Sequence, residues 1–203
     1  AVASNNYGYV SVLLGTGTGS FGAYTDFDLV EGSGGSVAIG DVNGDGKPDL
    51  VVALPFSLRV AVLLGTGTGS FAASPSLDSG LGATSVAIGD LNGDGSLDVV
   101  ATTVALPAQS IPGSVRVWLG NGTGGFGVRT DFATAGEPQM VRIADVNGDG
   151  KPDLVTANLT TPFDGASVAI GDVNGDGRLD LAVGGGASSS VLLGAGNGSF
   201  GAK

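Results

Sequence analysis

The sequence predicts an all-β protein, and three observations lead to this fold class. Glycine accounts for 39 of the 203 residues, whereas Asp, Glu, Lys and Arg together make up 13%, a balance that favours frequent turns over long polar helices. Short apolar runs such as 50–53 and 60–64 contain β-branched residues and are bounded by Gly, Pro or Asp, which is the pattern of strands. No segment sustains a helical period.

Two kinds of repeated hairpin alternate along the chain. The first, here called the acidic hairpin, is an apolar strand, an Asp-rich loop and a second apolar strand. Its four copies are SVAIGDVNGDGKPDLVVA at 36–53, SVAIGDLNGDGSLDVVAT at 85–102, VRIADVNGDGKPDLVTA at 141–157 and SVAIGDVNGDGRLDLAVG at 167–184. The second, the glycine hairpin, is an alternating strand that ends in a glycine-rich turn and a Phe. Its copies are VSVLLGTGTGSF at 10–21, VAVLLGTGTGSF at 60–71, VRVWLGNGTGGF at 115–126 and VLLGAGNGSF at 191–200.

An acidic hairpin followed by a glycine hairpin makes a four-stranded unit of about 50 residues, which is the length of a β-propeller blade. We therefore predict a single β-propeller domain, most simply with four blades of up to four antiparallel strands. The domain covers 1–203, with an N-terminal hairpin at 1–30 and blades at about 36–78, 85–132, 140–159 and 167–203. The alternative is a β-sandwich in which the hairpins resemble one another by chance. The near-identity of the four acidic loops argues against this alternative.

The third predicted blade lacks an outer hairpin, because only TTPFDG separates Leu159 from the fourth acidic hairpin. An incomplete blade exposes an unpaired sheet edge that can accept a further strand. The N-terminal hairpin can fill such an edge in its own chain, which closes a four-bladed ring. It can also fill an edge in a neighbouring copy, which gives a homo-oligomer or filament by strand complementation. A fragment of a longer, commonly seven-bladed propeller is the remaining arrangement.

The acidic loop D-x-N-G-D-G-x-x-D carries the oxygen donors that a hard cation such as Ca²⁺ requires. Side chains at positions 1, 3, 5 and 9 would supply ligands, and position 7, which varies among the copies, would supply its backbone carbonyl. Glycines at positions 4 and 6 permit the positive φ that lets these donors converge. The predicted ligands are Asp41, Asn43, Asp45, Lys47 and Asp49; Asp90, Asn92, Asp94, Ser96 and Asp98; Asp145, Asn147, Asp149, Lys151 and Asp153; and Asp172, Asn174, Asp176, Arg178 and Asp180.

Four Ca²⁺ ions, one in each loop, are therefore the expected cofactors. An EF-hand loop begins similarly but needs Glu at position 12 and flanking helices, whereas position 12 here is Val52, Ala101, Thr156 or Val183. Mg²⁺ fits less well because it keeps several of its waters. An Asp-Gly turn without metal is the structural alternative, and repulsion among three carboxylates within nine residues argues against it.

These loops, with the turn Gly-Thr-Gly-Ser-Phe at 67–71 and the segment Phe21-Gly22-Ala23, resemble the FG-GAP and VCBS calcium-binding repeats. The resemblance covers nearly the whole chain, and similar repeats form the β-propeller of integrin α subunits. It implies that Ca²⁺ lies in the turn that joins the first two strands of a blade.

The net charge of −11, with only 8 basic residues, argues against nucleic acid or an anionic membrane surface as a partner. No apolar run approaches the ~20 residues that span a bilayer, so we expect a soluble protein without membrane insertion. We expect it outside the cell or on the cell surface, because millimolar extracellular calcium would keep such loops filled.

Catalysis has little support, because the chain has no His and no Cys and so lacks the usual general bases and the thiol nucleophile. Paired carboxylates can hydrolyse glycosides, but the obvious pairs are assigned to calcium. The segment GTGTGSF at 15–21 and 65–71 is not a phosphate-binding loop, because a strand pattern follows it and not a helix. We therefore expect no enzyme activity.

Three sequons are candidate N-glycosylation sites, although Asn also suits the tight turns of the glycine hairpins. They begin at Asn121, Asn158 and Asn197.

Two functional classes fit the sequence. The first is an extracellular, calcium-stabilised structural or adhesive module of a cell-surface or fibrous assembly, because the chain is nearly all repeat. The second is a lectin-like or protein-binding propeller that recognises glycans or a surface partner through loops on one face. Aromatic side chains could form platforms on which a sugar stacks. Trp118 stands where the other glycine hairpins have leucine, so we expect it in the core. Phe163 and the tyrosines Tyr7, Tyr9 and Tyr24 are the other candidates, and the tyrosines, which lie near the N-terminus, are the freer ones to bind a sugar.

Overall fold

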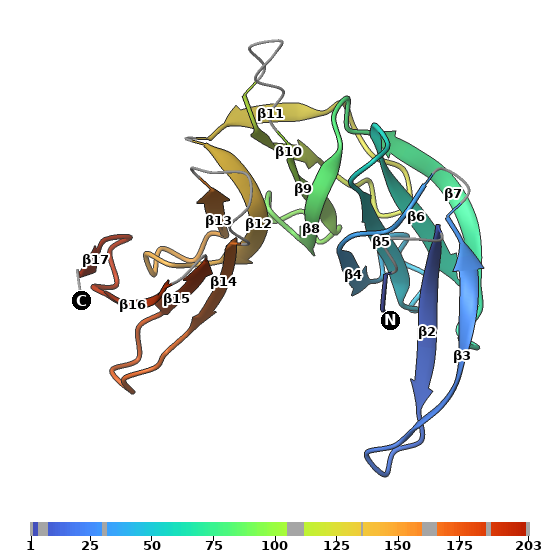
Figure 1. Ribbon diagram of the computed structural model, residues 1–203, viewed down its shortest axis with the longest axis horizontal. Helices are drawn as coiled ribbons and strands as arrows, with labels where there is room; N and C mark the ends of the chain where they lie inside the picture. The colour runs from blue at the N-terminus through green and yellow to red at the C-terminus, as the bar shows by residue number, and fades with distance from the viewer. Residues whose placement is uncertain are drawn as a thin grey trace.

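The computed structural model describes residues 2–3, 8–29, 32–104, 112–134, 136–159, 166–185 and 188–201. Within these ranges the protein is all-β, which confirms the predicted fold class, and no helix occurs. The strands form five antiparallel sheets that succeed one another along the chain. Figure 1 shows the sheets side by side in a curved arc, with the first strand of each four-stranded sheet on the inside and the last on the outside.

The first three sheets contain β1 to β11. The N-terminal sheet has the order β1-β2-β3, and each of the next two is a sequential four-stranded meander. Their strands are β1 (Val2–Ala3), β2 (Tyr9–Gly15) and β3 (Phe21–Asp28); β4 (Val37–Gly40), β5 (Asp49–Leu54), β6 (Arg59–Gly65) and β7 (Phe71–Asp78); and β8 (Ala83–Gly89), β9 (Asp98–Thr103), β10 (Ser114–Trp118) and β11 (Thr130–Ala133).

The fourth sheet consists of β12 and β13 alone, and the C-terminal sheet has the order β14-β15-β16-β17. Their strands are β12 (Glu137–Ala144) and β13 (Asp153–Leu159); and β14 (Ala166–Gly171), β15 (Asp180–Gly185), β16 (Ser188–Gly194) and β17 (Phe200–Gly201). The acidic hairpins thus supply the first two strands of each blade, and the glycine hairpins supply the last two where these are present.

The N-terminal hairpin forms a sheet of its own with β1. Strands β2 and β3 pair with each other, and β2 also pairs with β1, so in the described residues the hairpin does not complete the two-stranded sheet β12-β13. The two ends of the arc are apart (Figure 1). The structure therefore does not show the within-chain exchange that would close a four-bladed ring.

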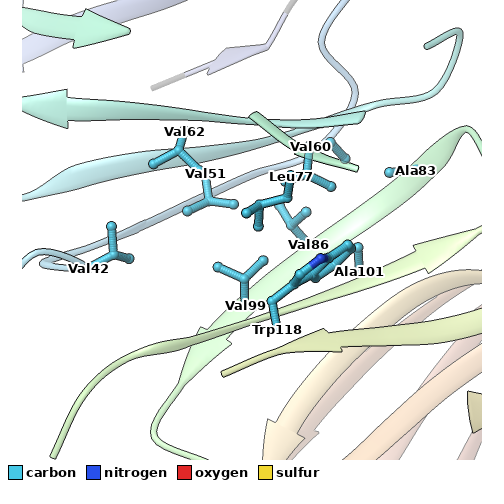
Figure 2. Close-up of a cluster of buried hydrophobic side chains, with 11 residues drawn as sticks. Val42, Val51, Val60, Val62, Leu77, Ala83, Val86, Val99, Ala101 and Trp118 are labelled. Carbon is cyan, nitrogen blue, oxygen red and sulfur yellow. The ribbon is translucent and has the colours of Figure 1, made fainter. Parts of the chain in front are cut away.

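The hydrophobic core is divided into four clusters, each between two successive sheets. We call the face of a sheet that packs on the next sheet along the chain its forward face, and the opposite face its backward face. Between the second and third sheets, Val51 and Val62 come from a forward face and Val86, Val99 and Trp118 from a backward face (Figure 2). The side chain of Trp118 is 3% exposed, which confirms its expected core position.

The other three clusters follow the same rule. In the second cluster, Val10 and Val12 of β2 pack against Leu50 and Val52 of β5. The third places Val100 of β9 against Val141 of β12, and the fourth places Ala157 of β13 with Val168 and Leu181. Side chains alternate across each strand, so every interior sheet contributes one face to the cluster before it and one to the cluster after it.

A charged group also joins the second and third sheets, at their outer strands. The Arg116 guanidinium lies 3.7 Å from Asp131, and Arg129 bonds both Asp131 (2.7 Å) and the carbonyl of Asp78 in the neighbouring sheet (3.1 Å). Desolvation by burial lowers the pKa of Arg116 from its ordinary value. Sequence reasoning missed this contact, because Arg116 occupies a strand position that holds Ala61 in the preceding blade.

The part of the chain that the structure describes holds no helix of the length and apolar character that crossing a membrane requires.

Candidate metal centre

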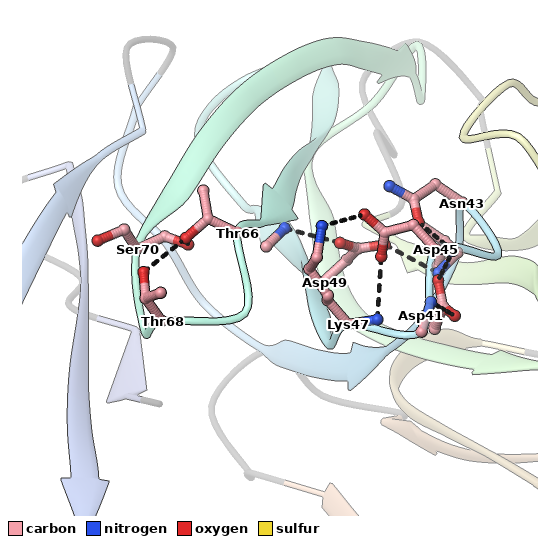
Figure 3. Close-up of polar contacts among 11 residues, drawn as sticks. Asp41, Asn43, Asp45, Lys47, Asp49, Thr66, Thr68 and Ser70 are labelled. Carbon is pink, nitrogen blue, oxygen red and sulfur yellow. Dashed lines mark hydrogen bonds and ion pairs between the residues drawn. The ribbon is translucent and has the colours of Figure 1, made fainter.

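The acidic loops and the glycine turns lie at the same end of their sheets. In a sequential antiparallel meander, the connections β4–β5 and β6–β7 leave from one end and the connection β5–β6 leaves from the other. Figure 3 shows the first acidic loop beside the turn of Thr66, Thr68 and Ser70. We call this end of the arc the loop face.

The carboxylate at position 1 is turned toward the amides of its own loop. Asp41 accepts the N–H of Asp45 at 3.1 Å and that of Gly46 at 2.7 Å. Asp90, Asp145 and Asp172 repeat this arrangement with the amides at positions 4, 5 and 6 of their loops. The loop can close in this way because the glycines at positions 4 and 6 have positive φ, for example 72° at Gly44 and 80° at Gly46.

Positions 3, 5 and 7 close the other side of the loop. The side-chain oxygen of Asn43 accepts the N–H of Asp45 at 3.0 Å, and Asp45 accepts the N–H of Lys47 at 2.9 Å. The Lys47 ammonium also lies 3.2 Å from the Asp45 carboxylate. The same amide bonds recur at Asn92, Asp94 and Ser96; at Asn147, Asp149 and Lys151; and at Asn174, Asp176 and Arg178.

Position 9 is different, because in three blades its carboxylate is fully buried and joins two hairpins. Asp49 accepts the N–H of Val42 at 2.9 Å and the N–H of Gly65, at the start of the glycine turn, at 2.7 Å. We call this pair of bonds the latch. The latches of Asp98 and Asp180 use the amides of Leu91 and Gly120, and of Val173 and Gly194.

The latch requires glycine in the outer hairpin. A Cβ atom on Gly65 would lie 2.0 Å from the carbonyl oxygen of Pro48, and one on Gly194 would lie 2.0 Å from that of Leu179. The sequence carried a signal for this role, because every glycine hairpin has a Gly directly after its strand. The partner of that Gly was not evident, because Gly65 and Asp49 are 16 residues apart.

The third acidic loop has half a latch. Asp153 accepts the N–H of Val146 at 3.0 Å, but the two-stranded sheet has no glycine turn to supply a second amide. Asp153 is accordingly half-buried, whereas Asp49 is fully buried.

Two of the four acidic loops also touch the glycine turn of the following blade. A Cβ atom on Gly44 would lie 2.8 Å from the carbonyl oxygen of Gly122, and one on Gly148 would lie 3.6 Å from that of Gly196. A Cβ on Gly93 or Gly175, the equivalent glycines of the second and fourth loops, would meet nothing within 4 Å. The first and third loops are therefore supported by a neighbour, and the second and fourth are open.

Hydrogen bonds favour the ionised form of some of the loop carboxylates, among them Asp94, Asp145 and Asp172. The N–H of Gly150 is the main cause that lowers the pKa of Asp145, and the N–H of Gly177 does the same for Asp172, although desolvation opposes both shifts. The amide of Ser96 likewise lowers the pKa of Asp94. Bonds that favour the charged form of an acid always act in this direction.

Acid is therefore expected to destabilise the loops even without metal. Because the folded pKa of Asp145 and Asp172 lies below the ordinary value of 3.8, their contribution is present above that value and is lost as the pH falls through the folded pKa. In chelator-containing buffer, the melting temperature should change little between pH 7 and 5 and should drop below about pH 4. The drop should be smaller in Asp145→Asn, and an identical profile in that variant would contradict the assignment.

The donor chemistry of each loop fits a hard divalent cation, since it offers three carboxylates and one amide oxygen. In Asp90, Asp145 and Asp172, Oδ1 accepts two N–H groups and Oδ2 accepts one, so Oδ2 keeps a lone pair that a cation can use. In the described residues, however, no three acidic side chains are close enough together to hold a metal. The position-1 carboxylates face their loop amides and the position-9 carboxylates belong to the latches, so calcium binding stays a prediction.

The other candidate residues lie at several places. Asn121 and Asn197 are exposed in glycine turns, where their side-chain oxygens accept the N–H groups of Thr123 and Ser199 at 3.0 and 3.1 Å, and Asn158 is exposed on β13. Both turn asparagines thus have the structural role that their position suggests, and glycosylation stays a prediction. Tyr9 and Tyr24 are exposed on the N-terminal sheet, whereas Tyr7 and Phe163 lie outside the described residues.

The fold and the loops define a class: a propeller of repeated blades with an acidic loop in the first hairpin of each complete blade. A family model of the FG-GAP-like repeat matches residues 1–52, 55–101 and 104–156, and a model of the FG-GAP repeat matches residues 165–202. The chain therefore belongs to the FG-GAP repeat family.

Among 21 matching chains of solved structure is a lectin from Agrocybe aegerita, described as specifically recognising non-reducing terminal N-acetylglucosamine. The two structures agree with a TM-score of 0.59 at 25% sequence identity, over 96% of this chain and 59% of that chain. This chain thus spans about three fifths of the lectin's length. The comparison with curated protein sequences found no match.

Proposed function

We propose that this chain is a calcium-stabilised binding propeller whose ligands are glycans. The observation that carries the proposal is the likeness to the Agrocybe aegerita lectin, which extends over 96% of the chain. The absence of His and Cys favours binding over catalysis. An extracellular setting suits the proposal, because calcium there is abundant enough to occupy loops of moderate affinity.

Calcium would be held by the side-chain oxygens at positions 1, 3, 5 and 9 of each acidic loop, with the position-7 carbonyl. In the first loop these are Asp41, Asn43, Asp45 and Asp49, with Lys47. The ion would neutralise the repulsion among three carboxylates in each loop. Because Asp49 also bonds Gly65 of the outer hairpin, an ion in the loop would stabilise the blade as well as the turn.

The loop face has the polar groups that sugar hydroxyls require. In the turn after β6, the hydroxyls of Thr66 and Thr68 are 2.9 Å apart, and Thr66 also bonds the carbonyl of Ser70 at 3.1 Å. The turn after β2 repeats this pair with Thr16 and Thr18. Hydroxyls both donate and accept hydrogen bonds, so these exposed turns suit a neutral, hydroxyl-rich ligand better than an anion, given the net charge of −11.

The glycan proposal predicts selective retention on an array. With millimolar calcium, the chain should bind glycans that end in N-acetylglucosamine more strongly than the same glycans without that residue. Removing three turn hydroxyls in Thr18→Val, Thr68→Val and Thr123→Val together should weaken binding by about a hundredfold, because three hydroxyls at about 1 kcal/mol each sum to about 3 kcal/mol.

The control for this test lies at the opposite end of the sheets. Phe56, in the turn between β5 and β6, is 82% exposed, and Phe56→Ala should bind like the unchanged chain. Loss of binding in Phe56→Ala with full binding in the triple variant would place the site at the other end and overturn the loop-face assignment. No retention of any glycan by calcium-loaded protein would overturn the glycan proposal itself.

The structural or adhesive role is the second candidate function. The observation that favours it is independent of glycan binding: the described part of the chain consists almost wholly of repeated hairpins that pack sheet on sheet through four similar clusters.

A further inference from the structure

The fourth sheet lacks the outer hairpin that its two neighbours have. It consists of β12 and β13 alone and lies in the arc between the third sheet and the C-terminal sheet (Figure 1). Only residues 160–165 separate β13 from β14, and this segment is too short to form two strands and a turn. We call the place beside β13 that a hairpin would take the outer position of the fourth sheet.

Strand β13 has the exposure of an edge strand, although it corresponds to a central strand of a complete blade. The corresponding strands β5 and β9 are buried at all six of their positions. In β13, residues 153–156 are half-buried and Asn158 is exposed. Among the described strands β13 pairs only with β12. No Lys, Arg or Pro stands between Leu154 and Asn158, so this edge lacks the residues that usually protect an open edge from pairing.

The third sheet exposes an aromatic side chain beside the outer position. Phe132 of β11 is paired with Val115 of β10, so both side chains lie on the forward face, where Val115 belongs to the cluster with the fourth sheet. The equivalent pair in the second sheet is Leu77 with Val60. Leu77 is 9% exposed and Phe132 is 52% exposed. The sheet that follows Leu77 has an outer hairpin, and the sheet that follows Phe132 has none.

The C-terminal sheet is incompletely covered on the opposite side of the same position. Leu192 of β16 packs in the cluster with the fourth sheet, which places it on the backward face, and it is half-buried. Its equivalents, each two residues before a latch glycine, are Leu63 and Trp118, which are 4% and 3% exposed. A hairpin in the outer position would therefore be packed between two sheets, as the outer hairpins of the second and third sheets are.

The third acidic loop provides the acceptor of a latch without its donor. Residues 41–50 and 145–154 have the same sequence, DVNGDGKPDL. Asp49 is fully buried, and its Oδ1 accepts the N–H of Gly65 at 2.7 Å. Asp153 is half-buried; its Oδ2 accepts the N–H of Val146, and within the described residues no N–H is bonded to its Oδ1. Because the two loops are identical, the difference comes from the hairpin beside them.

We propose that the outer position of the fourth sheet binds a β-hairpin of a partner protein by strand addition to β13. The incoming strand must be apolar on both faces, because Leu154 packs toward the third sheet and Val155 toward the C-terminal sheet. It must also end in glycine. A Cβ on Gly65 would lie 2.0 Å from the carbonyl oxygen of Pro48, and Pro152 stands at the same place in the third loop.

The latched strands of this chain define the motif that the partner must carry. They end in VLLG at 62–65, VWLG at 117–120 and VLLG at 191–194. The chain's own glycine hairpins are already paired within their sheets, so the occupant comes from another protein. The contact continues the sheet-on-sheet packing of the propeller. It uses a sheet edge and not the turn hydroxyls, so it is independent of the glycan proposal.

A synthetic hairpin tests the proposal. The probe is a fluorescent peptide with the sequence of residues 60–78, VAVLLGTGTGSFAASPSLD, because these residues fill the equivalent position beside the identical first loop. Titration with the 203-residue chain in calcium should give a saturable rise in anisotropy with one peptide bound per chain. A signal that does not saturate at millimolar chain would overturn the proposal, whether or not the chain binds glycans.

A second peptide isolates the latch without changing the protein. The same peptide with Gly65→Ala differs by one methyl group and should bind at least about tenfold more weakly, because its added Cβ prevents the bond to the Asp153 carboxylate. Equal affinity of the two peptides would overturn the assignment of the latch.

A charge beside the outer position identifies the site on the chain. Phe132→Glu should weaken binding of the unchanged peptide by at least about tenfold, because the incoming hairpin would bury an unpaired carboxylate. Phe56 is 82% exposed in the turn between β5 and β6, so Phe56→Glu is the control and should bind like the unchanged chain. Both variants must keep the circular-dichroism spectrum of the parent, and equal binding by the two would contradict the assigned site.

Light scattering distinguishes a partner protein from a second copy. Without peptide the chain should have a mass of 19.6 kDa. A larger mass that falls to this value when the peptide is added would show that a second copy occupies the outer position, and it would overturn the assignment to a partner protein.

Discussion

Removal of calcium is expected to lower the melting temperature of this protein more than any single substitution outside its core. If each loop binds calcium with a dissociation constant of ~10 µM and free calcium is ~1 mM, linkage contributes about 2.7 kcal/mol per loop. Over four loops the sum is comparable to the whole stability of an ordinary domain, about 5 to 15 kcal/mol. The measurement is thermal unfolding with millimolar calcium and with excess chelator.

The result depends on showing that the metal has left. Melting that is unchanged in chelator, with metal analysis confirming removal, would contradict a structural role for calcium. Asp94→Ala should reduce the bound calcium by one ion per chain, whereas Ser96→Ala in the same loop should not, because position 7 is expected to bind through its backbone. In the same titration, the first and third loops should fill at lower calcium, since the glycine turn of the next blade supports them and preorganises their donors.

The strands and their pairing could be predicted from the sequence because the information is local. The acidic hairpin places two apolar runs on either side of an Asp-Gly turn, and the structure pairs Leu50 of β5 with Ile39 of β4 and with Leu63 of β6. The short segment TTPFDG before the fourth acidic hairpin also indicated that the third blade lacks an outer hairpin, and the corresponding sheet has two strands. The acidic hairpin occurs four times in the sequence, so its strand pairing could be inferred from four copies.

The roles within the acidic loop could not be separated from the sequence. The motif presents positions 1, 3, 5 and 9 as four equivalent oxygen donors, yet Asp41 is turned to its own loop and Asp49 is buried against another hairpin. The different role of Asp49 depends on its contact with Gly65, which lies 16 positions further along the chain. A local sequence pattern does not show such a contact. The arrangement of the sheets as an open arc is non-local for the same reason, because it depends on the twist at every sheet-on-sheet contact.

Gly65→Ala is expected to destabilise the protein by about 3 kcal/mol or more, although it adds a single methyl group. The added Cβ would lie 2.0 Å from the carbonyl oxygen of Pro48 and 3.6 Å from the Asp49 carboxylate, so the glycine turn must move away from the acidic loop. The movement breaks the 2.7 Å bond from the Gly65 N–H to Asp49 and leaves a buried charge with one amide fewer. A hydrogen bond to a charged group contributes about 1.5 to 3 kcal/mol, and overpacking adds about 1 to 3 kcal/mol.

Gly15→Ala is the matched control, because Gly15 stands in the same segment LLGTGTGSF as Gly65. No acidic hairpin precedes it in its sheet, and a Cβ there would meet only the Phe21 ring, at 4.0 Å. Neither glycine has positive φ, so the two substitutions differ in the latch and not in backbone strain. We expect Gly15→Ala to change the stability by less than about 1 kcal/mol. Chemical denaturation of both variants at one calcium concentration measures the difference in the free energy of unfolding. Equal losses of stability in the two variants would show that the latch contributes nothing. A loss of stability confined to Gly65→Ala would show that Asp49 joins the two hairpins of a blade.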